Sequence, residues 1–321
     1  MRILANDGID ASGKKALMEA GHEVLTESVA QSSLVDFINQ ENIEGLLVRS
    51  ATQVRADIID GCPGLKWVGR GGVGIDNIDA AYAREKGIFV FNTPASSSLS
   101  VAELVMSLMF AAARFTYSAG GQMPNEGATQ FASLKKQYSK GFELKGKTLA
   151  VIGFGRIGRA LAGYAMGCGM RVIAVDRSGD EQTFIDWEIQ GLGIVQIPVS
   201  LVSLDSALQQ ADFISLHVPK QANGDAVLSA KEFALMKSNA WIVNTSRGGV
   251  VNEEDLLVAL NNNQISGACL DVFVGEPEPN AALLSHPKII STPHIGASTA
   301  EAQERIGLEI ASIVQDYMSK S

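Results

Sequence analysis

The chain has 321 residues, of which 46% are hydrophobic and 19% are charged, and its formal net charge is −9. This length and composition predict a folded protein of about two domains, and they exclude a disordered, collagen-like or disulfide-stabilised chain. The acidic balance excludes nucleic acid as a partner, because nucleic-acid binding needs a basic surface, and the longest apolar stretch is too short for a membrane span.

The three cysteines, Cys62, Cys168 and Cys269, lie far apart in the sequence and form neither a disulfide framework nor a metal-binding pair. The first residues lead directly into a strand pattern, without the layout of a signal peptide. Free thiols fit a reducing compartment. We therefore expect a cytoplasmic protein without a metal site.

Short apolar runs alternate with helical patterns along the whole chain, which is typical of a parallel sheet covered by helices. In the first part of the chain, the pattern predicts strands at 3–6, 23–25, 45–48, 65–68 and 88–91 and helices at 12–20 and 33–41. Arg49 directly follows the third of these strands, and Arg70 follows the fourth. These elements predict one small doubly wound unit.

A polar connector at 95–98 leads to an apolar helix at 101–113, and Ser100 with Glu103 predicts a capping box at its start. Residues 120–138 are polar and contain glycine, so we expect loops and a short helix there. A second series of strands is predicted at 148–152, 171–175, 213–216, 241–244, 267–271 and 289–292.

The remaining amphipathic helix, from residue 298 to the end, is too short to form a domain, so we expect it to pack on the first unit. The sequence therefore predicts an α/β fold with two doubly wound, Rossmann-like parallel-sheet domains. The predicted substrate domain is discontinuous and comprises residues 1–97 and 298–321, and the predicted NAD-binding domain comprises residues 98–297.

A glycine-rich loop follows the strand predicted at 148–152 and opens a helix. Its glycines, Gly153, Gly155 and Gly158, have the spacing that lets a backbone turn sharply and approach a pyrophosphate at a helix N-terminus. Asp176 ends the next strand, where an acid can bind the hydroxyls of a ribose and repel a 2′-phosphate. The loop predicts an NAD site, although Arg177 beside Asp176 leaves NADP open.

Three residues of complementary chemistry follow predicted strands in the second part of the chain: Arg247, Glu276 and His294. The carboxyl ends of parallel strands meet at one edge of a sheet, where ligands bind. Oxidation of a 2-hydroxy acid needs a base for the hydroxyl proton, a cation for the carboxylate and a carboxylate that orients the base. Glu278 is an alternative to Glu276 in the last of these roles, and His217 is interpreted as structural.

Four motifs occur in the order in which the D-isomer-specific 2-hydroxyacid dehydrogenase family carries them. They are VGRGGVGIDNID at 68–79, GFGRIG at 153–158, NTSRGG at 244–249 and STPHIGAST at 291–299. The resemblance covers nearly the whole chain and is strongest to the members that oxidise 3-phospho-D-glycerate to 3-phosphohydroxypyruvate, the first step of L-serine biosynthesis. It implies NAD as cofactor, His294 as the acid/base, Arg247 as the carboxylate clamp and Glu276 as the partner of the imidazole.

The resemblance also implies a set of binding residues and an oligomer. Besides the glycine loop, Asp176, Arg247 and His294, the cofactor contacts it implies are Arg156, Ile157, Val218, Pro219, Thr245, Ser246, Asp271 and Gly296. The substrate contacts it implies, besides Arg247 and His294, are Gly72, Val73, Gly74, and Arg49 and Arg70 for the phosphate. It further implies a homodimer, with the helix at 101–113 in the interface.

The segments 120–142 and 177–201 depart from the family pattern, and the chain ends soon after the last helix, so we expect no C-terminal regulatory domain. Two other functions stay open. If Arg49 and Arg70 are only structural, the protein is a reductase of small unphosphorylated 2-keto acids such as glyoxylate or hydroxypyruvate. Some members of the family resemble enzymes but act as NAD(H)-sensing corepressors that bind peptide motifs. Such a function needs added tails or a peptide-docking groove, which this sequence does not indicate.

Overall fold

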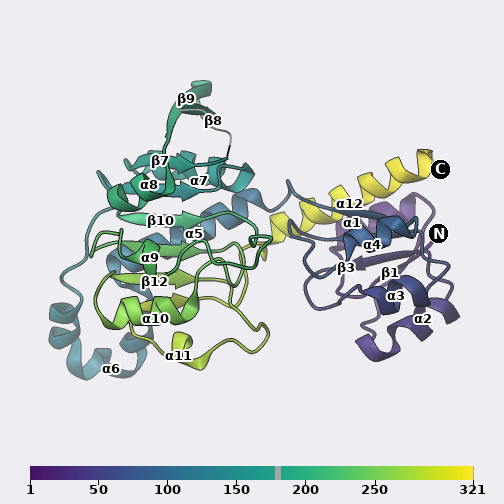
Figure 1. Cartoon of the computed structure of the whole chain (residues 1–321), viewed down its shortest axis with the longest axis horizontal. Helices are drawn as coiled ribbons and strands as arrows, with labels where there is room; N and C mark the ends of the chain where they lie inside the picture. The colour runs from purple at the N-terminus through teal and green to yellow at the C-terminus, as the bar shows by residue number, and fades with distance from the viewer. Residues whose placement is uncertain (178–181, 321) are drawn as a thin grey trace. The chain divides into compact units, whose positions relative to one another are not determined.

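The computed structural model describes residues 1–177 and 182–320. The chain divides into two compact units (Figure 1). Unit 1 comprises Met1–Ser100 together with the C-terminal segment that begins at Ala297, and unit 2 comprises Val101–Gly296.

Unit 1 contains a parallel sheet of five strands in the order β2-β1-β3-β4-β5. Its elements in chain order are β1 (Arg2–Ala5), α1 (Ala11–Glu19), β2 (Glu23–Leu25), the 3-10 helix η1 (Gln31–Ser33), α2 (Leu34–Gln40), β3 (Gly45–Val48), α3 (Ala56–Gly61), β4 (Trp67–Arg70), α4 (Ala80–Glu85), β5 (Phe89–Asn92) and α12 (Ala300–Lys320).

Helices cover both faces of this sheet, which is why its inner strand β3 is a continuous, buried apolar run. Successive strand residues point to opposite faces, so Leu46 packs against α2, α3 and α4, whereas Leu47 packs against α1 and α12. Helices α1 and α12 cross in backbone contact, because a Cβ atom on Gly13 would lie 2.4 Å from the Cα atom of Gly307. The C-terminal helix therefore completes the core of unit 1.

Unit 2 contains a sheet of eight strands in the order β13-β12-β11-β10-β6-β7-β9-β8, parallel except for the β8–β9 pair. Its elements are α5 (Ser98–Arg114), which begins in unit 1, α6 (Thr116–Gln137), β6 (Thr148–Ile152), α7 (Arg156–Gly167), β7 (Arg171–Val175), β8 (Gln182–Ile189), β9 (Gly193–Leu201), α8 (Leu204–Gln210), β10 (Phe213–Leu216), α9 (Ala230–Phe233), β11 (Trp241–Asn244), α10 (Glu253–Asn261), β12 (Gly267–Leu270), α11 (Ala281–Leu284) and β13 (Ile289–Ser291).

The chain leaves β6 toward β7 and β9 on one side of the sheet and returns through β10 to β13 on the other. This reversal between β6 and β10 is a topological switch point, and ligands of open α/β sheets bind outside the carboxyl ends of the strands at such a point. The predicted fold class, α/β with Rossmann-like parallel sheets, is confirmed.

Three local predictions are wrong. Residues 120–137 belong to the long helix α6, in which Leu134 is the buried residue and the polar side chains lie at exposed or half-buried positions. The capping box is absent because α5 begins at Ser98, so Ser100 lies inside the helix and donates its hydroxyl to the Ser97 carbonyl at 3.0 Å. Strand β4 begins two residues later than expected, because the Leu65 amide donates to the Cys62 carbonyl at 3.0 Å in the turn after α3, and pairing with β3 begins at Trp67.

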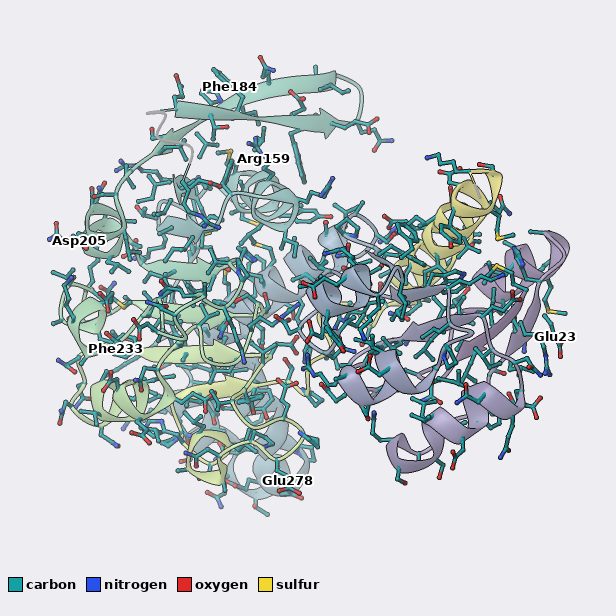
Figure 2. All side chains as sticks on the ribbon, turned by 45° about the vertical axis from the view of Figure 1, so that its right-hand side comes forward. Glu23, Arg159, Phe184, Asp205, Phe233 and Glu278 are labelled. Atoms are coloured by element: carbon teal, nitrogen blue, oxygen red, sulfur yellow. The ribbon has the colours of Figure 1, made fainter. Side chains whose placement is uncertain are left out.

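The hairpin β8–β9, within the divergent segment 177–201, was not predicted. It lies at the end of the unit 2 sheet, where β9 pairs in parallel with β7 (Figure 1). Trp187 anchors it against α7, since a Cβ atom on Gly163 would lie 2.1 Å from the indole ring. Arg159 of α7 donates to the Phe184 carbonyl, and Figure 2 shows these two residues beside each other. The period-two alternation of apolar residues in 182–189 is the signal that could have revealed it.

Among the described residues, α5 and α6 are long and apolar enough to cross a membrane only when taken together, and they are bent by 63° relative to each other. No helix in the described ranges meets that criterion alone.

Candidate active site

The glycine loop at the carboxyl end of β6 has the geometry of a phosphate cradle. Gly153 has a φ of +91°, and a Cβ atom there would lie 2.5 Å from the His217 carbonyl oxygen. A Cβ atom on Gly158 would lie 2.5 Å from the Gly153 oxygen, so both positions require glycine. Gly155 faces open space and caps α7 without a side chain. The amides of the first turn of α7 can therefore bind an anion.

Asp176 lies directly beside this loop. Its Oδ2 accepts the amide of Phe154 at 2.9 Å, and its Oδ1 accepts the amide of Arg177 at 2.6 Å. Each carboxylate oxygen keeps a second acceptor site, which a pair of ribose hydroxyls can occupy. The negative charge at this place disfavours a 2′-phosphate.

Two polar side-chain atoms at the same edge of the sheet are buried without a hydrogen-bond partner among the described residues. His217 follows β10 and Thr245 follows β11, and these strands are neighbours in register. His217 Nδ1 and Thr245 Oγ1 have no hydrogen-bond partner in the described part of the chain. Burial lowers the pKa of His217 to about 4, so the imidazole is neutral and its Nε2 contacts Ser215 Oγ at 2.8 Å. Buried polar atoms normally have partners, and hydroxyl or amide groups of a dinucleotide can supply them.

The other predicted cofactor contacts also lie at this edge of the sheet. Arg156 and Ile157 are the first two residues of α7, and Val218 and Pro219, Ser246, and Gly296 follow β10, β11 and β13. Together with the glycine loop, Asp176 and the two unpartnered atoms, these positions fit a dinucleotide such as NAD.

The structure brings Glu276 and His294 into contact. Glu276 Oε1 accepts the amide of Phe273 at 2.8 Å, and its Oε2 lies 2.7 Å from His294 Nδ1. This contact places Nδ1 toward the carboxylate and leaves Nε2 for a reacting group. Glu276, rather than Glu278, therefore lies against the imidazole; Figure 2 shows Glu278 at the border of unit 2.

Asp271 anchors the turn that carries His294. This carboxylate is only 1% exposed, and it accepts Thr292 Oγ1 at 2.6 Å and the amides of Ile295 and Gly296 at 2.8 and 2.9 Å. The bonds hold His294 in the left-handed region, with a φ of +55°. In this structure the carboxylate of Asp271 therefore orders the His294 turn, a role that the sequence did not reveal.

Arg247 lies in a turn after β11 that the side chain of Asn244 closes. Asn244 Nδ2 donates to the Arg247 carbonyl at 3.0 Å, and its Oδ1 accepts the amide and hydroxyl of Ser246. A Cβ atom on Gly248 would lie 1.9 Å from the Phe273 oxygen, so this turn packs directly on the turn that leads to Glu276. The turns after the neighbouring strands β11, β12 and β13 thus form one continuous surface.

Two predicted substrate residues adjoin each other in unit 1. Val48, before Arg49, pairs with Arg70 across β3 and β4, and Arg70 Nε donates to the Arg49 carbonyl at 3.3 Å. Asn77 Nδ2 donates to the same carbonyl at 2.9 Å. Two guanidinium groups therefore come from one carboxyl edge of the unit 1 sheet.

The predicted backbone contacts Gly72, Val73 and Gly74 form the turn after β4. Gly72 has a φ of +149°, and a Cβ atom on it would lie 2.5 Å from Arg70 Nη1. Asn92 donates its side-chain amide to the Val73 carbonyl. The turn is therefore shaped around the Arg70 side chain.

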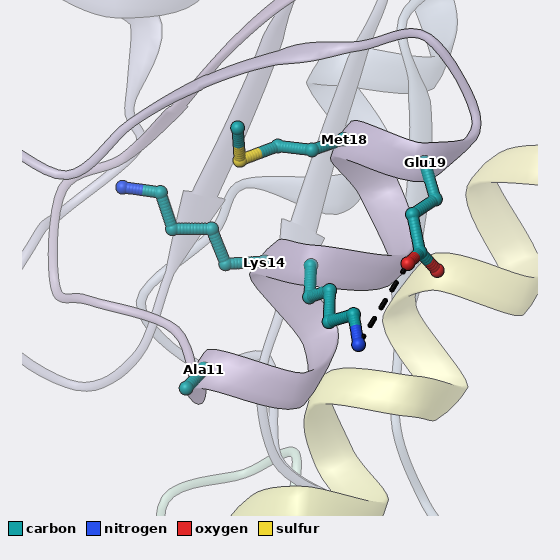
Figure 3. A pocket seen from close by; sticks show the side chains of 5 residues that line it. Ala11, Lys14, Met18 and Glu19 are labelled. Atoms are coloured by element: carbon teal, nitrogen blue, oxygen red, sulfur yellow. Dashed lines mark ion pairs between the residues drawn. The ribbon is translucent and has the colours of Figure 1, made fainter.

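A shallow hollow on the outer side of α1 contains none of these residues (Figure 3). It is lined by Ala11, Lys14, Lys15, Met18 and Glu19. Glu19 Oε1 forms an ion pair with Lys15 Nζ, one helical turn earlier in α1, at 3.8 Å. Such an exposed pair at helical spacing supports the helix and indicates no ligand.

A Rossmann-like sheet with a phosphate cradle and an imidazole–carboxylate pair at one edge defines a nicotinamide-dependent dehydrogenase. Residues 106–296 match the family model described as D-isomer specific 2-hydroxyacid dehydrogenase, NAD binding domain. The chain belongs to this family, as its motifs predicted, and it is an NAD-dependent oxidoreductase of 2-hydroxy acids.

The chain is similar to two named enzymes and to one solved structure, among others. The chain is 42% identical over 313 residues to the hydroxypyruvate reductase of Thermotoga maritima, covering 96% of this chain and 95% of that protein. It is 38% identical over 312 residues to the D-3-phosphoglycerate dehydrogenase of Homo sapiens, covering 97% of this chain but only 55% of the relative. A crystal structure from Thermus thermophilus has a TM-score of 0.82 at 30% identity, covering 97% of this chain and 94% of that one.

Replacement of Asp176 by alanine tests the cofactor site. We expect NAD to bind about ten-fold more weakly or worse, because hydrogen bonds to a charged group contribute about 1.5–3 kcal/mol each, while NADP affinity falls less or rises. Titration of both cofactors by protein fluorescence gives the ratio. Asp186→Ala removes an equal charge from the exposed hairpin strand β8 and serves as the control. If the Asp176→Ala variant keeps the wild-type preference for NAD over NADP, other residues determine that preference.

Proposed function

We propose that this protein oxidises 3-phospho-D-glycerate to 3-phosphohydroxypyruvate with NAD, the first step of L-serine biosynthesis. The observation that carries the proposal is the pair Arg49 and Arg70 at one edge of the unit 1 sheet, in a chain whose net charge is −9. The negative charge of the whole chain repels an anionic substrate, and two neighbouring arginines can offset this repulsion locally and bind an anionic group. A phosphorylated hydroxy acid carries a phosphate in addition to the carboxylate that Arg247 binds.

In the proposed reaction, His294 Nε2 accepts the proton of the substrate hydroxyl while the hydroxyl carbon loses a hydride. When NAD is bound, its nicotinamide ring would accept this hydride. Glu276 holds Nδ1 at 2.7 Å and stabilises the imidazolium that forms. Arg247 binds the substrate carboxylate in a fork, which orients the hydroxyl toward the imidazole.

Reduction of hydroxypyruvate is the second candidate, and the similarity to the Thermotoga maritima reductase over 95% of its length favours it. The keto acids of the two reactions, hydroxypyruvate and 3-phosphohydroxypyruvate, have the same three-carbon skeleton and differ only in the phosphate group. The chain spans about half the length of the phosphoglycerate dehydrogenases it matches, such as the human one at 55%. The choice between the two substrates therefore depends on what Arg49 and Arg70 bind.

Alanine variants of the two arginines decide between these substrates. We expect Arg49→Ala and Arg70→Ala each to lower kcat/KM for 3-phosphohydroxypyruvate about 100-fold, since a desolvated charged contact is worth about 1.5–3 kcal/mol, and to change the hydroxypyruvate value only a few-fold. Steady-state NADH oxidation measures both. Arg84→Ala, in the last turn of α4, is the control. If the wild type prefers hydroxypyruvate and neither variant changes the ratio, the second candidate is the function.

We also propose a homodimer in the cytoplasm. Helices α5 and α6 carry exposed apolar side chains, among them Phe110, Tyr117 and Phe131 at 45, 55 and 61% exposure. Such side chains on adjacent helices are typical of an interface. All three cysteines are free thiols, which suits a reducing compartment. Sedimentation equilibrium at micromolar concentration measures the proposed stoichiometry.

A further inference from the structure

Glu253 lies at the turn that carries Glu276, although no motif marks it and the proposed mechanism does not use it. It is the first residue of α10, and the side chain of Asn252 caps this helix. The Oε1 atom of Glu253 instead accepts the amide of Val274 at 2.7 Å. Its carboxylate therefore binds a neighbouring turn rather than its own helix.

That turn, residues 273–276, positions the partner of the imidazole. The amide before that of Val274, which belongs to Phe273, donates to Glu276 Oε1 at 2.8 Å, and Glu276 Oε2 contacts His294 Nδ1 at 2.7 Å. Successive amides of one turn thus donate to two different carboxylates. Glu253 holds the turn from α10, and Glu276 extends from it to the imidazole.

The carboxylates of Glu253 and Glu276 act on each other electrostatically. Burial raises the pKa of Glu253 above its ordinary value, the negative charge of Glu276 raises it further, and the Val274 amide opposes both. Two cationic residues, Arg247 and Lys220, lie on adjoining turns. Lys220 is near the Arg247 turn, because a Cβ atom added to Gly249 would lie 3.9 Å from Lys220 Cε. Glu253 is therefore a second carboxylate in the field of the Glu276–His294 pair.

We propose that Glu253 is a positioning residue of the hydride-transfer site. Its carboxylate fixes the 273–276 turn so that Glu276 meets His294, and its charge adds to the support that Glu276 gives to the protonated imidazole. The proposal rests on the roles that the proposed function gives to His294 and Glu276. A carboxylate that orients the partner of a reacting group changes the rate without contacting substrate, because small misplacements of that group are costly.

Two substitutions separate the two parts of the role. Glu253→Gln keeps an oxygen that can accept the Val274 amide and removes the charge, whereas Glu253→Ala removes both. Glu254, the next residue on α10, is exposed and lies in the same helical turn. Glu254→Gln and Glu254→Ala therefore reproduce the change in helix charge without touching the 273–276 turn. Each variant is measured for kcat, KM, the pH dependence of kcat/KM, NADH affinity and thermal unfolding.

We expect Glu253→Ala to lower kcat about ten-fold, with NADH affinity and unfolding temperature close to those of Glu254→Ala. Glu253→Gln should keep most of kcat and move the pH–rate profile to lower pH by a few tenths of a unit, on the order expected for loss of one partly screened charge. The shift is downward because a removed negative charge no longer favours the imidazolium.

Two results would overturn the proposal. One is a kcat for Glu253→Ala equal to that of Glu254→Ala. The other is a pH–rate profile for Glu253→Gln that coincides with that of Glu254→Gln. Glu276→Gln and His294→Asn are measured in parallel. If these two keep wild-type turnover, the proposed mechanism itself fails. If they lose turnover while the Glu253 variants match their controls, this inference alone fails.

Discussion

Replacement of His294 is expected to lower kcat about 1,000-fold, within the range of about 10²–10⁴ typical for loss of a general acid or base, while NADH affinity stays within about two-fold. The residue has a φ of +55°, so His294→Asn is a better test than alanine. Asparagine tolerates the left-handed region and its amide cannot take up the hydroxyl proton. The turn held by Asp271 should therefore persist around a site that lacks its base.

Stopped-flow measurement of hydride transfer, with NADH binding followed by fluorescence, separates the chemical step from cofactor affinity for this variant. His286→Asn is the matched control, since this histidine lies after α11 and its ring contacts the Lys288 amide. Wild-type turnover in His294→Asn would remove the imidazole from the reaction. A loss of NADH affinity as large as the loss of kcat would instead indicate a collapsed cofactor site.

The central strands of the unit 2 sheet could be predicted from the sequence because the side chains on both of their faces are buried in the core. Residues 148–152, 171–175, 213–216 and 241–244 are apolar runs bounded by turn residues, and the structure has strands at these bounds. Surface elements are less well specified. The polar helix α6 and the hairpin β8–β9 bury only one side, so local composition resembled that of a loop.

In the candidate site, too, some residues could be predicted from the sequence and others could not. Residue types and strand ends indicated Glu276 and His294 and the edge of the sheet where they lie, and their contact is present at 2.7 Å. The residues that order this pair could not be predicted. Asp271 acts through three bonds to the His294 turn, and Glu253 through one amide of another turn. Such contacts depend on how separate turns pack, which the order of residues along the chain does not reveal.

Removal of the Arg247 guanidinium is expected to lower kcat/KM for the 2-hydroxy acid by about 100- to 1,000-fold. A forked pair of charged hydrogen bonds to a carboxylate contributes about 3–4 kcal/mol in a dry site. The loss should divide between KM and kcat, because the clamp both binds the substrate and aims its hydroxyl at the imidazole. Arg247→Lys keeps the charge without the fork, so we expect it to recover only part of kcat/KM.

The turn that presents Arg247 is closed by Asn244 and packs on the 273–276 turn through Gly248, so truncation of the side chain leaves its backbone supported. Thermal unfolding of Arg247→Ala should accordingly match that of Arg171→Ala, a variant at the opposite, amino end of β7. A kcat/KM for Arg247→Ala within about three-fold of the wild type, a difference of less than 1 kcal/mol, would mean that another cation binds the substrate carboxylate. A kcat/KM for Arg247→Lys equal to that of the wild type would mean that only charge, and not the planar fork, matters at this position.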